Sequence, residues 1–320
     1  MQGINRFIIK RLILLVPTVL IVLTVIFFAL NVLPGDAAKI YVGLELVSPE
    51  GLTMVRQRMG LDVPIHVRYF RWIWGVLHGD LGQSLITGQP VQLILAQRLP
   101  ITLTVTAITL VFSICVAIPL GVVAALKRNT KFDFLASSAI LVGSSMPTFW
   151  LGIILIIIFS VSLGLLPSAG FDTTLFYNNP LRALGYLVLP SLTLSGWCAA
   201  NLTRIVRSSM LEIMMQDYII TARAKGLTER IVIFKHALRN SLIPMVTVLG
   251  LQMASLLGGA VATETIFSIA GIGTLVLASV YNRDYTVLQG TLLVVAVLLV
   301  LLNLVIDVAY AYVDPRIRLR

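Results

Sequence analysis

The stretch Asp217–Pro244, DYIITARAKGLTERIVIFKHALRNSLIP, is the longest charged island in the apolar carboxy-terminal half of the chain. Its helix-forming run Ile219–Lys225 ends at Gly226, a residue type that readily adopts the left-handed conformation that closes a helix. Thr228 then stands where a second helical run, Ile231–Leu238, needs an N-cap. The stretch therefore predicts two short helices joined by a glycine elbow.

A helix–glycine–helix elbow is rigid and projects from its surroundings, which suits a mechanical contact with a partner. Small residues at Ala222, Ala224 and Gly226 would let a partner backbone approach closely. The cations of the stretch also fit an ordinary basic cytoplasmic loop that meets phospholipid headgroups. The residues alone leave both interpretations open.

The composition of the whole chain indicates an integral membrane protein. Of its 320 residues 58% are hydrophobic and only 12% are charged, and the mean hydropathy is +0.96. Ordinary soluble domains are about 45–50% apolar, so a soluble fold could not bury this much apolar surface. The formal net charge of +10 does not indicate a nucleic-acid partner, because the Lys and Arg residues lie largely between apolar runs, where the positive-inside rule places them.

Six apolar runs are long enough to cross a bilayer, which needs about 20 residues. They cover Leu12–Leu33, Ile101–Leu126, Phe134–Leu166, Leu184–Ile205, Leu242–Thr263 and Val287–Val313. Pro147 divides the third run, which predicts a kinked helix with a cytoplasmic lead-in. The basic segments between the runs place both termini in the cytoplasm. The sequence thus predicts an all-α membrane protein with six transmembrane helices.

The same pattern predicts how the chain is organised. An amino-terminal transmembrane helix covers residues 1–33, an extracytoplasmic cap segment 34–100, a membrane core 101–313 with a cytoplasmic loop at 206–241, and a basic cytoplasmic tail 314–320. Within the core, Glu264–Tyr285 is expected to form an outer loop. The cap contains an aromatic cluster of Tyr69, Phe70, Trp72 and Trp74, which would either anchor the segment at the headgroups or contact a ligand.

No pattern of catalytic residues accompanies the apolar runs. The sequence contains no phosphate-binding glycine loop with its Lys-Ser/Thr, no HExxH and no nucleophile elbow. Cys115 and Cys198 lie inside apolar runs and imply no disulfide framework. We therefore expect no enzyme activity and no metal or cofactor on this chain. Uphill transport would then need either ion coupling or a motor on another chain.

Charge inside the predicted membrane segments is sparse. Asp307 is the one charged residue well within an apolar run, with Asn303 one turn before it, and Gln252 is a further intramembrane polar residue. A mid-membrane charge costs about 2.5–3.5 kcal/mol on insertion scales and usually persists for a functional reason. Asp307 also fits an interhelical hydrogen bond or a position near the inner headgroups. The pattern favours an external motor, with a stand-alone ion-coupled carrier or channel as the alternative.

The elbow resembles the coupling loop of bacterial ABC importer permeases, whose signature is EAA, three residues, Gly, nine residues, then I-x-L-P. Ile220-Thr221-Ala222 stands at the EAA place, Gly226 at the glycine and His236-Ala237-Leu238-Arg239 at I-x-L-P. The departures from the signature resemble the peptide/nickel branch, in which T-A-R-A-K-G-L and H-A-L-R-N are typical.

Motifs along almost the whole chain resemble the first, or B-type, permease of that branch. They are Gly60-Leu61-Asp62-x-Pro64, Gly79-Asp80-Leu81-Gly82-x-Ser84, Arg98-Leu99-Pro100-x-Thr102-Leu103, Gly250-Leu251-Gln252, Glu264-x-Ile266-Phe267, Arg283-Asp284-Tyr285 and Asp314-Pro315-Arg316-Ile317-Arg318. Ser268-Ile269-Ala270-Gly271 departs from the usual S-x-P-G, and Thr286 stands where Pro is common, so the loops are where this chain would differ from the family.

The resemblance implies a type I ABC importer permease in the bacterial inner membrane. Its implied partners are a second permease, two ATPase subunits and an extracytoplasmic substrate-binding protein, with ATP and Mg²⁺ bound by the ATPase subunits. The implied substrates are short peptides or related solutes such as nickel chelates and glutathione.

Three groups of residues are candidate functional positions. The implied ATPase-coupling loop contains Thr221, Ala222, Arg223, Ala224, Lys225, Gly226, Leu227, His236, Arg239 and Asn240. Glu264, Arg283 and Asp284 are candidates for a binding-protein contact or outer gate, by their predicted place outside the membrane. Gln252, Asn303 and Asp307 are the intramembrane polar candidates.

Overall fold

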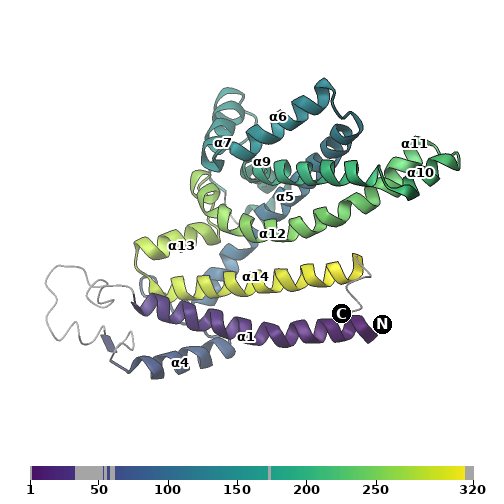
Figure 1. Cartoon of the computed structure of the whole chain (residues 1–320). Helices are drawn as coiled ribbons and strands as arrows, with labels where there is room; N and C mark the ends of the chain where they lie inside the picture. Colours follow the sequence, from purple (N-terminus) through teal and green to yellow (C-terminus); the bar gives the residue numbers. More distant parts are fainter. Residues whose placement is uncertain (1, 33–52, 54–55, 58–61, 172–173, 314–320) are drawn as a thin grey trace. The chain divides into compact units, whose positions relative to one another are not determined.

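The computed structural model of the chain describes residues 2–32, 53, 56–57, 62–171 and 174–313 (Figure 1). These residues fold almost entirely into helices, and the one β-type pairing among them is an isolated bridge between Gln83 and Pro90. The all-α prediction is therefore confirmed. The predicted basic tail at 314–320 and most of residues 33–61 lie outside the described residues.

Within the described residues, five helices are long and apolar enough to cross a bilayer. They are α1 (Gln2–Val32), α5 (Val91–Leu126), α9 (Pro180–Ile213), α12 (Leu238–Ile266) and α14 (Tyr285–Val313). Each of them contains most or all of one apolar run that the sequence predicts as a span. Helix α5 begins at Val91 rather than at Ile101, so it takes in the end of the segment predicted as a cap.

The sixth predicted span is a broken pair of helices. Helix α6 (Lys131–Ser145) is followed by α7 (Thr148–Leu155), which continues into the π-helical η1 (Ile156–Ser162), and the two halves are bent by 106°. The break falls at Pro147, as predicted, because a proline disfavours helical backbone in the residue before it. The bend is much sharper than that of the single kinked helix expected from the sequence.

Shorter helices lie between the spans. They are α4 (Ile65–Leu77), α8 (Leu175–Asn178), α10 (Asp217–Ala224), α11 (Glu229–Ile231) with the π-helical η2 (Val232–Ala237), and α13 (Ile272–Tyr281). Helix α11 and η2 run directly into α12, so one continuous helix covers Glu229–Ile266. The prediction of a loop over Glu264–Tyr285 is wrong, since the apolar helix α13 fills much of that interval.

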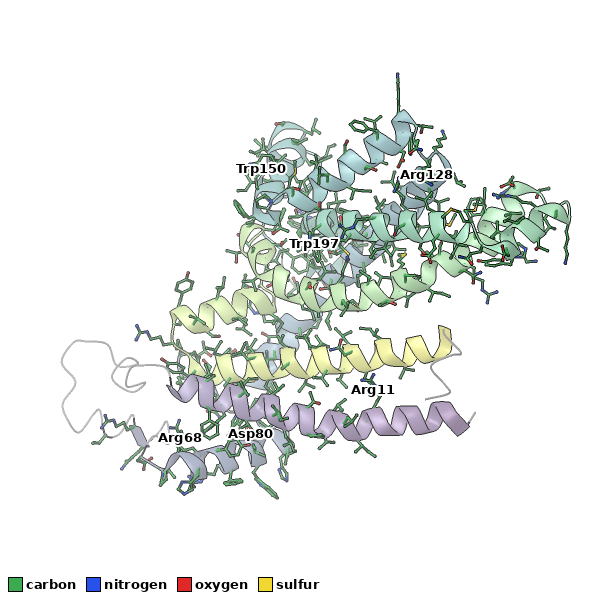
Figure 2. The ribbon with its side chains drawn as sticks, viewed as in Figure 1. Arg11, Arg68, Asp80, Arg128, Trp150 and Trp197 are labelled. Atoms are coloured by element: carbon green, nitrogen blue, oxygen red, sulfur yellow. The ribbon has the colours of Figure 1, made fainter. Side chains whose placement is uncertain are left out.

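The chain divides into two compact units, and the first comprises residues 1–8, 101–273 and 302–320. Helix α9 is central to it and packs against α6, α7 and α12 (Figure 1). The α9 side chains of Leu187, Leu202, Val206 and Met210 are buried, and Trp197 packs against the same core (Figure 2). Burial on several faces makes α9 the inner helix of this unit.

The second unit comprises residues 9–100 and 274–301. Two glycines allow the chain before and at the start of α5 to approach the first turns of α14 closely. A Cβ on Gly82 would lie 2.8 Å from Thr286 Cγ2, and one on Gly290 would lie 2.6 Å from Val91 Cγ1. In the same unit, α4 packs against the last turns of α1 through ring contacts of Phe27.

Candidate functional site

The predicted glycine elbow is present between α10 and α11. Gly226 has a φ of +77°, in the left-handed region that favours glycine. The Gly226 N–H donates to the Arg223 carbonyl at 2.9 Å, and the Leu227 N–H donates to the Ala222 carbonyl at 3.4 Å. These two bonds form a Schellman motif, which satisfies carbonyls at the end of α10 and fixes the direction of the turn.

The start of the second helix is also where the sequence predicts it, although one detail differs. Thr228 is the N-cap residue of α11 and its backbone is extended, with a ψ of 144°. Its side chain makes no capping hydrogen bond. Instead, Arg223 and Glu229 form an ion pair across the turn, with Nε and Oε1 2.7 Å apart. Both side chains are exposed, so the pair contributes only about 0–1 kcal/mol.

The inner face of the elbow is closely packed. Ile219 and Ala222 on α10 are buried, and so are Val232 and Ala237 on η2, against which α10 packs. The expectation that Ala222 offers its small side chain to a partner is therefore wrong, because that side chain faces inward. Ala224 and Gly226 are exposed, so they remain candidates for a close contact with a partner backbone.

The outer surface of the elbow mixes apolar and cationic side chains. Ile220 and Leu227 are 56% and 37% exposed, and Thr221, Arg223 and Lys225 are exposed around them. This composition fits a protein partner better than open water, because large apolar side chains gain free energy when a partner covers them.

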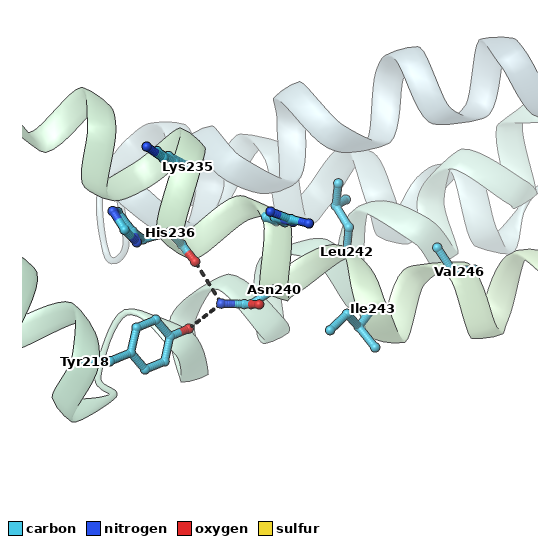
Figure 3. A pocket seen from close by; sticks show the side chains of 8 residues that line it. Tyr218, Lys235, His236, Asn240, Leu242, Ile243 and Val246 are labelled. Carbon is cyan, nitrogen blue, oxygen red and sulfur yellow. Dashed lines mark hydrogen bonds between the residues drawn. The ribbon is translucent and has the colours of Figure 1, made fainter. Parts of the chain in front are cut away.

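The remaining coupling-loop residues lie in a separate cleft of about 670 Å³ (Figure 3). His236, Arg239 and Asn240 line it together with Tyr218. The Asn240 side-chain N–H donates to the Tyr218 hydroxyl and to the His236 carbonyl, at 3.0 Å each. The cleft therefore joins the second end of the coupling signature to Tyr218 at the start of α10, and the tip of the elbow does not line it.

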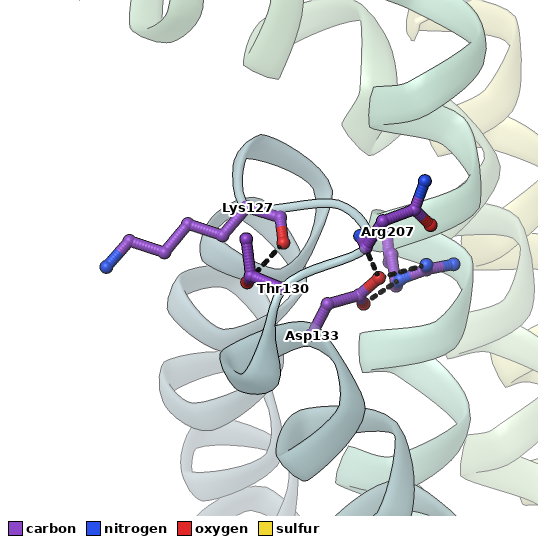
Figure 4. Close-up of polar contacts among 5 residues, drawn as sticks. Lys127, Thr130, Asp133 and Arg207 are labelled. Carbon is purple, nitrogen blue, oxygen red and sulfur yellow. Dashed lines mark hydrogen bonds and ion pairs between the residues drawn. The ribbon is translucent and has the colours of Figure 1, made fainter.

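Sequence reasoning missed an ion pair that supports the helix leading to the elbow (Figure 4). Arg207 on α9 donates to Asp133 at the start of α6, with Nε–Oδ1 at 2.7 Å and Nη2–Oδ2 at 2.8 Å. The Asn129 N–H also donates to Asp133 at 3.1 Å. Such a bidentate pair fixes both position and orientation. Since 74 residues separate the partners, no local pattern could have indicated the contact.

Glu264 lies inside the protein at the end of α12, so its side chain is not exposed for a binding-protein contact, and the outer-gate role stays a prediction. Its side chain is 1% exposed in the last turn of α12 and accepts a hydrogen bond from the Thr102 hydroxyl of α5 at 2.5 Å. The Thr102 oxygen in turn accepts from the Ile272 N–H at 2.8 Å. A Cβ on Gly271 would overlap the Glu264 carboxylate, so glycine provides the room for this contact.

Asp284 is likewise buried, whereas Arg283 is exposed. The Asp284 carboxylate accepts from the Ser84 hydroxyl at 2.5 Å and from the Val287 N–H at 3.2 Å. The second bond satisfies a free N–H at the start of α14, as an N-cap does. Of the three residues predicted for a binding-protein contact or outer gate, only Arg283 is therefore at the surface of the described chain.

The structure describes the side chains of two of the three intramembrane polar candidates. Gln252 is buried on α12, where its side-chain oxygen accepts from the Cys198 thiol of α9 at 2.6 Å. Asn303 on α14 is exposed. The side chain of Asp307 lies outside the described residues, so its proposed role stays a prediction.

Comparison with known proteins matches two family descriptions. Residues 117–319 match the family described as binding-protein-dependent transport system inner membrane component, and residues 4–106 match the N-terminal part of such a membrane component. The chain is 40% identical to the dipeptide transport system permease protein DppB of Escherichia coli K12 over 98% of both chains. It is 42% identical to a putative peptide transport system permease of Brucella abortus, over 98% of this chain and 99% of that one. It is 41% identical to the glutathione transport system permease GsiC of Salmonella paratyphi A, over the same shares.

Among solved structures, an inward-facing crystal form of the MetNI methionine ABC transporter aligns with a TM-score of 0.57 and 21% identity. The alignment covers 70% of this chain and 97% of that chain, and it confirms the ABC importer permease fold predicted from the sequence. The chain therefore belongs to the binding-protein-dependent transport system inner membrane components, as a multi-pass permease of an ABC importer in the bacterial inner membrane.

Proposed function

We propose that this permease moves short peptides, or related solutes such as glutathione or nickel chelates, delivered by an extracytoplasmic substrate-binding protein. Its 40–42% identity over almost the full chain to permeases named for dipeptide, peptide and glutathione transport supports this substrate class. The general partners of such a permease are an ATPase and a substrate-binding protein. In our proposal the assembly contains a second permease and two ATPase subunits, which bind the ATP and Mg²⁺.

The elbow is the observation that carries the mechanical part of the proposal. Its tip is exposed at Leu227 and Lys225, while its inner face is anchored at Ile219 and Val232. Because α10 packs on η2, η2 continues into α12, and α12 packs along α9, a displacement of the elbow would move both long helices together. Closure of the ATPase subunits would thus be converted into a rigid-body movement of the spans.

Purification of the tagged full-length chain in mild detergent tests the proposal. Mass spectrometry should find a second permease and an ATPase, and the preparation should hydrolyse ATP. Reconstituted vesicles should then take up a radiolabelled dipeptide only when ATP and the binding protein are both supplied. Uptake by the chain alone, driven by an ion gradient, would instead establish the stand-alone carrier.

A further inference from the structure

Helix α4 has one face that packs on α1. The Tyr69 ring centroid lies 5.3 Å from that of Phe27, and the Trp72 centroid lies 5.7 Å from it. The Tyr69 hydroxyl and the Thr24 hydroxyl form a hydrogen bond of 2.7 Å. Three contacts from two α4 residues, which lie one turn apart, therefore hold it against α1.

The opposite face of α4 is apolar and uncovered. Phe70, Trp74 and Leu77 are 68%, 66% and 69% exposed, and their spacing places them along one side of the helix. Removal of apolar surface from water lowers the free energy, so three such side chains in a row favour a non-aqueous environment. We call these three side chains the Phe70–Trp74–Leu77 stripe. A non-aqueous surface should cover the stripe, and the neighbouring helix α1 indicates which surface that is.

Helix α1 is a candidate membrane span over Arg11–Leu30, and only 11% of its apolar window is buried within the chain. The hydroxyl contact at Thr24 lies about 9 Å before the end of that span, with a rise of about 1.5 Å per residue. The contact therefore places α4 beside the last turns of a helix whose own apolar side chains are largely uncovered within the chain (Figure 1). A phospholipid surface that covers this end of α1 is then next to the uncovered side of α4.

The polar residues of α4 agree with this placement. Arg71 is exposed at the edge of the apolar stripe, and Arg68 lies toward the α1 side of the helix (Figure 2). His78, at the end of the helix, packs against Trp74 with ring centroids 4.4 Å apart. Cations and amphipathic aromatic rings are the side chains that accumulate at phosphate headgroups.

From these observations we propose that the Phe70–Trp74–Leu77 stripe of α4 is a lipid-contact surface in the leaflet at which α1 ends. The three side chains contact phospholipids, and Arg71 at the edge of the stripe is available to their phosphate groups. The lipid-bound helix holds the segment that follows it, including Ser84 and its contact with Asp284, close to the membrane surface.

Single cysteines on α4 test the proposal. Phe70→Cys and Leu77→Cys are made in a Cys115→Ser background, because Cys115 is exposed while Cys198 is buried. The full-length chain, with the subunits that co-purify with it, is placed in nanodiscs of phosphatidylethanolamine and phosphatidylglycerol. Each variant is labelled with a lipid-soluble maleimide and, separately, with a sulfonated, membrane-impermeant maleimide. The rate with the lipid-soluble reagent is divided by the rate with the impermeant reagent.

Two further cysteines calibrate the ratio of rates. Ile21→Cys reports a lipid-facing position on α1, where the native side chain is 64% exposed, and Asp62→Cys reports a water-facing position just before α4. We expect the ratios at positions 70 and 77 to match that of Ile21→Cys and to exceed that of Asp62→Cys by about tenfold or more.

Other outcomes would overturn the proposal. A ratio like that of Asp62→Cys would show that the stripe faces water. If added substrate-binding protein then slowed the impermeant reagent, the stripe would be a protein-docking face. Slow reaction with both reagents, below the rate of Ile21→Cys with the lipid-soluble one, would show that another subunit covers it. Apart from Asp62, the three residues replaced by cysteine are exposed apolar side chains, so loss of folding is not an expected outcome.

Discussion

At the scale of single residues, Gly226 and Gly185 differ in their backbone conformation and not in the space around them. A Cβ would meet nothing within 4 Å at Gly226 or at Gly185, but only Gly226 has a positive φ. A left-handed conformation costs a residue with a side chain about 1–2 kcal/mol, and more when the side chain is β-branched. We expect Gly226→Val to distort the elbow and lower ATP-dependent uptake at least several-fold, at equal membrane abundance.

Gly185→Val is the matched control, since it introduces the same side chain into equally open space on the helical backbone of α9. It should leave uptake near the wild-type rate. Normal uptake by Gly226→Val, with membrane abundance measured by immunoblot, would rule out a role of this turn in coupling.

The buried Thr102 hydroxyl supports a second residue-scale prediction. It donates to Glu264 and accepts from the Ile272 N–H, so its removal takes one partner from each of two buried groups. A buried polar group that loses its partner costs about 1–3 kcal/mol. We expect Thr102→Val to lower the melting temperature of the detergent-solubilised protein and Thr102→Ser, which keeps the hydroxyl, to change it much less. Equal melting of the two variants would contradict the proposed role of this hydroxyl.

At the scale of helices, the Arg207–Asp133 pair joins α6 to α9, whereas the Arg223–Glu229 pair joins neighbouring helices across one turn. Asp133 is nearly buried and its pair is bidentate, so removing it should destabilise the protein by about 1–3 kcal/mol, allowing for the partial exposure of Arg207. The exposed pair should contribute about 0–1 kcal/mol. Denaturation of Asp133→Ala and of Glu229→Ala, followed by helix content, measures both costs, and a larger cost for Glu229→Ala would contradict the comparison.

The helices also show how far the sequence predicts the fold. Apolar runs locate the spans because only helices satisfy their own backbone groups in a bilayer. Helix ends are harder to predict. Helix α5 starts at Val91, but its first turns contain Gln92 and Arg98, so hydropathy alone does not detect them as helical. The π-helical η2 has no distinctive local composition. The segment predicted as a loop contains the apolar helix α13, whose 10 residues are too few to be recognised as a span.

The candidate site follows the same rule. Gly226 and Thr228 were predictable because turn and cap preferences are local. The inward orientation of Ala222 and the burial of Glu264 and Asp284 were not, because they depend on helices distant in sequence. A charged residue next to an apolar run looks the same in the sequence whether its carboxylate faces solvent or is buried at a helix end.

At the scale of the whole assembly, the elbow makes a prediction about the contact between this chain and its ATPase partner. Ala222 and Ala224 both lie on α10, but Ala222 is buried and Ala224 is exposed. A cysteine at each position can be treated with a maleimide that carries a photoreactive benzophenone, in the purified importer lacking Cys115. The same chemical change is thus introduced on opposite sides of one short helix.

We expect the Ala224→Cys variant to react with the reagent and, on illumination, to cross-link to an ATPase subunit, because the exposed face of α10 would lie in that subunit's groove. The Ala222→Cys variant should react poorly and yield no such product, since its side chain packs inside the elbow. Gel electrophoresis and mass spectrometry identify the cross-linked partner. If the benzophenone at position 224 were captured by lipid in the intact importer, the elbow would be a basic loop at the headgroups, and the mechanical coupling proposed through α9 and α12 would have to begin elsewhere.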